Sequence, residues 1–221
     1  MDLSVFELKR SMVVSVAMPY DSLEDALSLA QNCDQYLGIA VLPTFVKSLR
    51  AALPEELPCR LVGLIGYPSG AVTCSTKVTE IRQLIYQGCN AFNIVANTAL
   101  MLSDEWDEVE CDLYSTIKAV KNMPVTITLE TAYLDTQRLG QVARILRDLD
   151  VEAVATSSGW LPVLPDLATI SILQSQLGEK VAIEVANIQN YDQLAAAQSA
   201  GARRFMVRKQ HAEAIFALMA N

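Results

Sequence analysis

The chain has 221 residues, of which 52% are hydrophobic, and a formal net charge of −8. Its lysines and arginines are scattered rather than gathered into a stripe, so we expect neither nucleic acid nor a membrane among its partners. No apolar run reaches the roughly 18 residues that a membrane span needs, and residues 1–7 lack the basic region of a signal peptide, so we expect a cytoplasmic protein.

Eight short apolar segments are predicted to be β-strands. They are rich in Val, Ile and Leu and are mostly continuous rather than alternating, which is typical of parallel strands covered by helices on their outer face. In chain order the predicted strands are residues 11–18, 36–42, 60–67, 91–96, 125–130, 152–156, 181–186 and 204–208.

The segments between the strands have apolar residues at helical spacing. In the fourth of them, for example, Trp106, Val109 and Leu113 share one helical face. The predicted helices are residues 22–33, 44–53, 76–87, 103–122, 136–149, 165–177, 192–200 and 211–219, with an additional short helix around residues 3–10.

This alternation amounts to eight strand–helix units of about 25 residues each and predicts a (β/α)₈ TIM barrel of the α/β class. A doubly wound open sheet is the alternative. Its nucleotide-binding form is disfavoured, because neither Gly-x-Gly-x-x-Gly nor Gly-x-x-x-x-Gly-Lys-(Ser/Thr) occurs. No linker or change of composition divides the chain, so we expect residues 1–221 to form one barrel domain with a short N-terminal helix.

Cysteine and histidine usage limits the chemistry that the chain can support. The five cysteines, an odd number without Cys-x-x-Cys spacing, are expected to be free core thiols in a reducing compartment. His211 is the only histidine, and it lies beyond the last predicted strand. A metal site with imidazole ligands is therefore not expected. We predict no metal and no cofactor.

One strand carries a family resemblance. Residues 152–159, Glu-Ala-Val-Ala-Thr-Ser-Ser-Gly, resemble the Phe-(Val/Ile)-Lys-Thr-Ser-Thr-Gly strand of the deoxyribose-phosphate aldolase family. Residues 61–71, 77–80, 88–95 and 125–134 are similar to further motifs of that family in the same order. The resemblance extends from about residue 14 to residue 209 and implies the fold of a class I aldolase, which works through a Schiff-base lysine.

The resemblance also shows which positions of this sequence correspond to the family's catalytic and phosphate-binding residues, and the residues at these positions differ from those of the family. The position of the Schiff-base lysine is occupied by Ala155. The position of the second lysine, which lowers the pKa of the first, is occupied by Glu184, and that of the proton-transferring aspartate by Asn93. Asn187 and Ile188 replace two glycines whose N–H groups approach the substrate phosphate. A methyl group cannot form an imine, and an amide cannot act as a carboxylate base, so the resemblance implies the fold without its usual chemistry.

Two cations follow the last predicted strand. Lys209 is the one lysine expected near the C-terminal end of a strand, which is the face where barrel active sites form. With Arg208 it stands where the family has serines that help to hold phosphate. The pair is either an anion clamp or the solvated start of the last helix. Glu184, expected in a buried strand, either pairs with one of them as a structural salt bridge or takes part in binding.

The candidate binding residues are therefore polar groups expected inside the barrel or near the C-terminal ends of its strands, and no catalytic residue is predicted. They are Asn93, Glu130, Ser157, Ser158, Gly159, Glu184, Arg208 and Lys209. The apolar segment of residues 160–165 is expected either to plug the barrel mouth or to contact a partner.

Three functional hypotheses follow. The first is a non-catalytic relative of the family, which binds a phosphorylated sugar or small anion or serves as a subunit of a homodimer or of a hetero-oligomer with an active relative. The second is an active carbon–carbon lyase acting on a deoxyribose 5-phosphate-like sugar, with Lys209 as a relocated amine and Glu184 or Glu130 as proton carrier. The third is imine-free chemistry, with the same two glutamates as paired acid and base.

Overall fold

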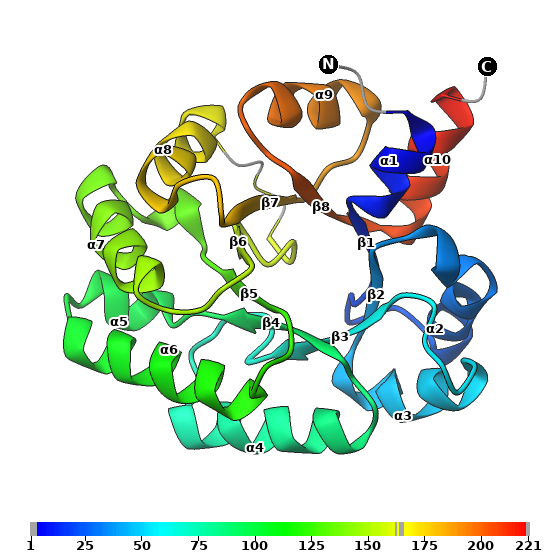
Figure 1. The fold of residues 1–221 in the computed structure, drawn as a ribbon, viewed down its shortest axis with the longest axis horizontal. Helices are drawn as coiled ribbons and strands as arrows, with labels where there is room; N and C mark the ends of the chain where they lie inside the picture. Colours follow the sequence, from blue (N-terminus) through cyan, green and yellow to red (C-terminus); the bar gives the residue numbers. More distant parts are fainter. Residues whose placement is uncertain (1–3, 162, 164–165, 220–221) are drawn as a thin grey trace.

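The computed structural model describes residues 4–161, 163 and 166–219. In them, eight parallel strands pair in chain order, and the last pairs with the first, so that the sheet closes into a barrel (Figure 1). The strands are β1 (Met12–Val16), β2 (Gly38–Val41), β3 (Arg60–Ile65), β4 (Ala91–Val95), β5 (Val125–Thr128), β6 (Ala153–Ala155), β7 (Ala182–Ala186) and β8 (Arg204–Arg208). The predicted (β/α)₈ fold is confirmed, and every strand lies within its predicted range.

Helices form a ring around the barrel (Figure 1). None of those in the described ranges is long and apolar enough to cross a membrane. The α-helices are α1 (Val5–Arg10), α2 (Leu23–Ser28), α3 (Pro43–Ala52), α4 (Cys74–Tyr86), α5 (Thr98–Leu102), α6 (Trp106–Val120), α7 (Thr136–Arg147), α8 (Leu167–Leu177), α9 (Tyr191–Ser199) and α10 (Lys209–Met219), and the 3₁₀ helices are η1 (Leu29–Gln35) and η2 (Thr131–Tyr133).

The predicted helix at residues 103–122 is wrong at its start. Helix α6 begins at Trp106, and a separate helix, α5, ends at Leu102, just before the predicted range; Asp104 between them adopts a positive φ of 58°. Arg138 of α7 donates hydrogen bonds to the carbonyl oxygens of Met101 and Leu102 at the end of α5, at 3.1 and 3.5 Å. A helix end satisfied by a side chain from a distant element leaves no local signal in the sequence.

The main hydrophobic core lies between the barrel and the helices. Outward-facing strand residues such as Ile39, Ile94 and Ile183 pack there against the buried faces of the helices. Inside the barrel, by contrast, many positions are small. These include Gly38, Ala40, Ala91, Ala153, Ala155, Ala182 and Ala186. Small inward residues leave room for long side chains to enter the barrel from its ends.

Strand register shows which side chains share the interior. Ala155 of β6 lies opposite Thr128 of β5 and Glu184 of β7, and Glu184 lies opposite Arg204 of β8. Thr128 donates a hydrogen bond of 2.5 Å to the side-chain oxygen of Asn93 on β4. The three positions at which the resemblance expects two lysines and an aspartate therefore all face the inside of the barrel.

A buried ion pair joins α4 to α6. The ammonium of Lys77, which is fully buried, donates to a carboxylate oxygen of Asp112 at 2.6 Å and to the carbonyl of Val95 at 2.9 Å. The cysteines are all free thiols, as expected, but only three are buried, because Cys74 is half-buried and Cys111 is exposed.

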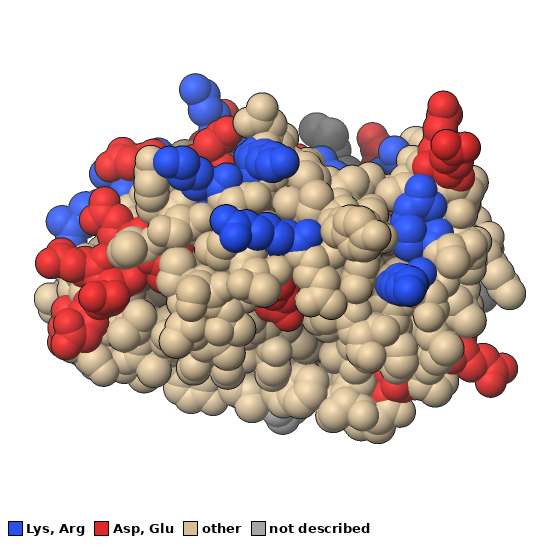
Figure 2. Space-filling view, turned by 90° about the horizontal axis from the view of Figure 1, so that it is seen from below, with Lys and Arg blue, Asp and Glu red and all other residues tan. Residues whose placement is uncertain are grey.

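A groove of about 660 Å³ runs between the outer faces of α4 and α6. Its floor includes Val78 and Ile85, and its cations are Arg82, Lys118 and Lys121. Figure 2 views the molecule from the side of α4; blue side chains gather on the upper half of this face and red ones toward its left edge. Both signs of charge are thus present on one side of the protein.

Candidate functional site

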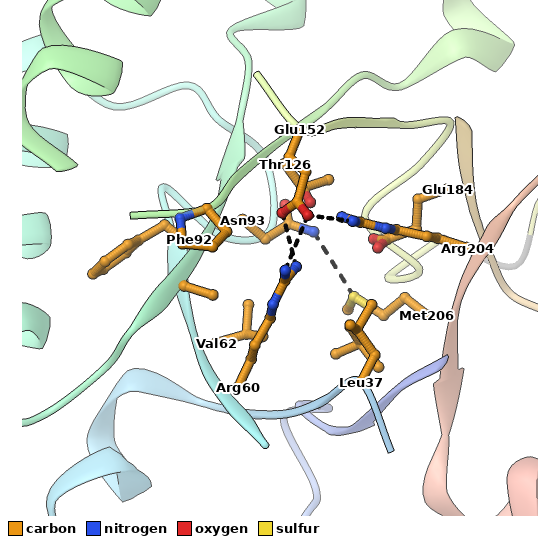
Figure 3. Close-up of a pocket in the computed structure, with 13 residues that line it drawn as sticks. Leu37, Arg60, Val62, Phe92, Asn93, Thr126, Glu152, Glu184, Arg204 and Met206 are labelled. Carbon is orange, nitrogen blue, oxygen red and sulfur yellow. Dashed lines mark hydrogen bonds and ion pairs between the residues drawn. The ribbon is translucent and has the colours of Figure 1, made fainter. Parts of the chain in front are cut away.

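Three charged side chains meet inside the barrel at the N-terminal ends of the strands (Figure 3). Arg60 opens β3, Arg204 opens β8, and Glu152 immediately precedes β6. Arg60 donates to both carboxylate oxygens of Glu152, at 2.8 and 2.9 Å, and Arg204 donates to one of them at 2.5 Å. Burial alone would raise the pKa of Glu152, but the two guanidinium groups outweigh it and hold that pKa at about 2.

Glu184 is buried in the same interior, and its side chain is 2% exposed. Its Oε1 atom makes no hydrogen bond with any described residue. Burial raises the pKa of Glu184 to about 7, against the opposing effect of Arg204 and Arg60. Of the two alternatives for Glu184, the salt bridge with Arg208 or Lys209 is not formed among the described residues, whereas a role in binding stays a prediction. The cation next to Glu184 in register is Arg204, and Glu152 already binds that guanidinium.

The interior groups share a small cavity. Asn93, Thr126 and Glu184 line a space of about 20 Å³ together with the ion cluster, which is comparable with the roughly 10–15 Å³ that one water molecule needs. The amide nitrogen of Asn93 points to the sulfur of Met206 at 3.9 Å (Figure 3). Among the described residues no lysine lines this cavity. The described lining of this cavity therefore offers the buried carboxyl group of Glu184 and no amine nucleophile.

The C-terminal mouth of the barrel is nearly filled. Arg208 donates hydrogen bonds to the hydroxyl of Tyr20 at 3.2 Å and to the carbonyl of Gly159 at 3.3 Å. The cavity that remains beside Ser158, Gly159 and Arg208 has about 10 Å³, with Tyr67 on its wall. Arg208 thus links the segment after β1 to the segment after β6 and leaves little room for a ligand between them.

The loop after β6 is fastened over this mouth. The side-chain amide of Asn187 donates to the carbonyls of Leu161 and Val163, the second at 3.1 Å. Asn187 has a positive φ of 63°, so it adopts the backbone conformation that glycine favours at this position. Trp160 packs edge-to-face on Tyr67, with ring centroids 5.6 Å apart. Part of the expected segment, residues 162, 164 and 165, lies outside the described residues.

Lys209 is the first residue of α10 and lies outside the mouth cavity. Its ammonium is 3.6 Å from a carboxylate oxygen of Glu213, one helical turn further on. Together with Arg208 it lines a pocket of about 160 Å³, but Asp21, Asp25 and Glu213 line that pocket too. The two cations that were expected to hold an anion therefore share their surroundings with three carboxylates.

Glu130 and the residues after β6 meet on the same face. The backbone N–H of Ser158 donates to Glu130 Oε1 at 2.9 Å, and Glu130 is 8% exposed. Both residues line a pocket of about 370 Å³ that also includes Trp160. The hydroxyl of Ser157 is buried and has no hydrogen-bond partner among the described residues.

The predicted site residues therefore do not form one constellation. Asn93 and Glu184 lie in the lower interior cavity, Gly159 and Arg208 at the mouth, and Glu130 beside it. Ser158 borders both the mouth and the pocket beside it, whereas Lys209 lies in a further pocket outside the mouth.

Sequence reasoning missed the ion cluster. The signal that could have found it is the two-residue alternation of Arg204, Met206 and Arg208, which places all three on the inner face of β8. In the described ranges, no three His, Cys, Asp or Glu side chains come together in a group that could hold a metal ion.

Comparison with known proteins places this geometry in a family. No family model matches the chain. It is 31% identical over 186 residues to a deoxyribose-phosphate aldolase from Klebsiella pneumoniae, covering 82% of this chain and 75% of the relative. It is 24% identical over 207 residues to the enzyme of that name from Caldanaerobacter subterraneus, covering 91% and 89%. A tetrameric deoxyribose phosphate aldolase from Aeropyrum pernix shares the fold, with a TM-score of 0.85, 19% identity and coverage of 97% of this chain and 91% of that one. The chain therefore belongs to the deoxyribose-phosphate aldolase family.

Proposed function

We propose that this protein is a non-catalytic member of its family, without Schiff-base aldolase activity. The supporting observation is a pair of neighbouring inward positions, at the end of β6 and in the middle of β7. They carry Ala155 and Glu184, in register with each other, where the family resemblance expects two lysines. An imine requires an amine at that place, and the described interior offers a methyl group, a carboxyl group and the amide of Asn93.

The electrostatics of the interior support the same proposal. A Schiff-base lysine is activated when a neighbouring cation lowers its pKa, so that the amine is neutral at working pH. Glu184 has the opposite effect, because a carboxylate favours the protonated form of an amine beside it. Asn93 has no proton to exchange, since its amide does not titrate in this range. Nucleophile, activator and proton carrier are thus replaced together.

In place of catalysis, we propose that the protein binds a phosphorylated sugar or small anion, or that it serves as a subunit of an oligomer. A phosphorylated sugar or small anion would meet Arg208 and the hydroxyl of Ser158 at the mouth. Because the cavity there has about 10 Å³, binding requires the loop around Trp160 to move away from Tyr67. Calorimetric titration with deoxyribose 5-phosphate tests this. Binding that is lost in Arg208→Gln supports the site, and binding unaffected by that change contradicts it.

A second candidate function is an active lyase, which the relatives named as aldolases favour. Lys209 is the amine available to it, in the 160 Å³ pocket with Asp21, Asp25 and Glu213. The amine would add to the sugar aldehyde and lose water to give an iminium. A neighbouring carboxylate would then accept the proton of the hydroxyl two carbons from the iminium carbon as the carbon–carbon bond breaks and its electron pair passes to the iminium, and water would release the product from the amine. The paired glutamate chemistry with Glu184 and Glu130 is not favoured, because the two residues line separate cavities.

One assay separates these functions. Purified protein is incubated with deoxyribose 5-phosphate, and acetaldehyde release is followed with a coupled dehydrogenase. The proposal predicts no turnover above the buffer rate. Turnover that disappears in Lys209→Ala but persists in the matched surface variant Lys180→Ala would establish the relocated amine. Turnover that survives Lys209→Ala would instead require different chemistry.

As a subunit, the protein is proposed to pair with a second copy of itself through the groove between α4 and α6. The first turn of α6 carries Asp107 and Glu108, and its other end carries Lys118 and then Lys121. Two copies packed with α6 antiparallel would bring each acidic end against a basic one (Figure 2). Light scattering should give a dimer that Lys118→Glu dissociates. A monomer in the unchanged protein contradicts this, and a complex formed only with an active relative would point to a hetero-oligomer.

A further inference from the structure

A pocket of about 370 Å³ opens on the C-terminal face of the barrel, beside the closed mouth. Its walls come from the segments that follow four consecutive strands, β3 to β6, and include Leu102 of α5, Glu130, and Trp160 after β6. This is the face on which ligands bind in α/β barrels, and the volume falls in the range of roughly 300–1,000 Å³ that small-molecule sites occupy. The proposed anion site at the mouth shares Ser158 with this pocket but does not use Glu130, Tyr133 or Leu102.

The charge that lines this pocket is negative. Glu130 is 8% exposed, and one of its carboxylate oxygens accepts the N–H of Ser158. Its other oxygen makes no hydrogen bond with a described residue, and none of the lining residues is a lysine or an arginine. The guanidinium of Arg138, which lies behind α5, is already bound to Asp104 at 3.0 Å and Asp135 at 2.8 Å. A ligand here meets a buried carboxylate that retains a free acceptor.

The remaining walls are largely apolar and contain two aromatic rings. Tyr133 of η2 and Trp160 both line the pocket, and the edge-to-face contact with Tyr67 fixes the orientation of Trp160. The hydroxyl oxygen of Thr98, also on the wall, is buried without a hydrogen-bond partner in the described structure. Aromatic ring faces attract cations, and they do so more strongly where water is excluded.

We propose that this pocket binds a small organic cation with an apolar body, such as an alkylammonium or quaternary ammonium compound. The ammonium would lie against the free oxygen of Glu130 and the rings of Tyr133 and Trp160, and its alkyl part against Leu102. A phosphorylated sugar does not fit this chemistry, because it would bring a dianion to an unpaired carboxylate. The site therefore goes beyond the proposed function and differs from it in the sign of ligand charge.

Choline and its uncharged carbon analogue, in which carbon replaces the quaternary nitrogen, test the role of charge at nearly constant shape. In Trp106→Phe, Trp160 is the only remaining tryptophan, and its fluorescence reports binding in the pocket. Choline should change this signal saturably, and the carbon analogue should bind at least about tenfold more weakly. In Arg208→Gln, which lacks the proposed anion contact at the mouth, inorganic phosphate and deoxyribose 5-phosphate should not compete with choline.

Two variants assign the binding to the pocket. Glu130→Gln keeps an acceptor for Ser158 and should remove the preference for choline, whereas Glu179→Gln on the exposed surface should leave it unchanged. Ala99→Phe, at an exposed position on the pocket wall, should block both ligands without disturbing the core, and melting curves confirm that each variant folds. Equal binding of choline and its analogue, competition by phosphate in Arg208→Gln, or no saturation by about 50 mM choline would overturn the proposal. None of these results depends on whether the barrel cleaves a sugar.

Discussion

Glu184 and Glu152 show how the barrel interior treats two carboxyl groups in opposite ways. Two guanidinium groups bind Glu152 and hold its pKa at about 2, whereas burial without a hydrogen-bond partner for Oε1 raises the pKa of Glu184 to about 7. The arginines, Arg60 and Arg204, neutralise one carboxylate directly and the other only from a distance. The interior therefore contains one permanently charged cluster and one group that titrates near neutral pH.

This difference predicts the pH dependence of stability. Folded Glu184 retains its proton between pH 4.5 and about 7, where the unfolded chain has lost it, so its contribution to the free energy of unfolding falls as pH rises through that window. Glu184→Gln should remove this fall. At pH 8 the variant should be more stable than the unchanged protein by at most about 3 kcal/mol, since one pKa unit corresponds to about 1.4 kcal/mol. Urea unfolding at pH 5 and pH 8 measures the free energy of unfolding of the variant and of the unchanged protein.

Glu152→Gln is the matched control, with the opposite sign. The stability that Glu152 contributes is present above pH 4.5 and is lost as pH falls toward 2, so this variant should be destabilised at both pH 5 and pH 8. An unchanged pH slope in Glu184→Gln would show that Glu184 is already ionised at pH 5 in the folded protein.

The buried pair of Lys77 and Asp112 gives a second prediction. Lys77→Met removes the cation and leaves the carboxylate of Asp112 unpaired in the core, which should cost about 3–5 kcal/mol of unfolding free energy. The double variant Lys77→Met/Asp112→Leu should recover much of that loss, because no uncompensated charge remains. If urea unfolding shows equal losses for the single and double variants, the pair is not the source of the effect.

At the residue scale, the sequence predicted which residues occupy the interior positions better than it predicted which residues form ion pairs with one another. That Ala155, Glu184 and Asn93 replace the expected lysines and aspartate could be predicted from the motifs, and the register confirms that they face inward. The partners of Glu152 and Lys77 could not be predicted, because each comes from an element far away in the chain and is chosen by the closure of the barrel and the packing of the helices.

At the scale of elements, the strands were predictable because a parallel strand buried on both faces is a continuous apolar run. The break between α5 and α6 was not, since Arg138 of α7 satisfies the end of α5 from outside. The loop after β6 is likewise held by a side chain from a distant element. Its apolar sequence indicated a mouth cover or a partner contact, but its fastening depends on the amide of Asn187, two elements later.

The turn between β3 and α4 gives an element-scale prediction. Gly70 has a positive φ of 68°, and a Cβ atom there would lie 2.2 Å from the carbonyl oxygen of Ala96. Gly178 also has a positive φ, of 76°, but a Cβ atom there would meet nothing within 4 Å. Gly178→Ala should therefore cost only backbone strain, about 1 kcal/mol. Gly70→Ala adds a clash with backbone and should cost about 3 kcal/mol or more.

Thermal or urea unfolding of the two glycine variants measures the difference. Because both glycines have a left-handed backbone, the comparison isolates the close approach of the β3–α4 turn to the end of β4. Equal losses would mean that the turn can move away from Ala96 without cost.

At the scale of the whole molecule, the chain has the (β/α)₈ fold of its family, and the proposal of lost catalysis rests on what lines the interior of the barrel. The inward positions that would support an amine instead hold a carboxyl group, an amide and small residues, and long charged side chains fill the opposite end. Arg208, Asn187 and Trp160 close the mouth around a cavity of about 10 Å³. The larger open spaces among the described residues are a pocket of about 370 Å³ to one side of the mouth and a groove of about 660 Å³ on the helical surface.

The most direct test of this account is reductive trapping. The protein is incubated with deoxyribose 5-phosphate, and separately with acetaldehyde, in the presence of borohydride, and the intact mass is then measured; a lysine-bearing aldolase of the family serves as positive control. The account predicts an adduct on the control and none on this protein. A stable adduct mapped by peptide sequencing to a lysine of this chain would contradict it.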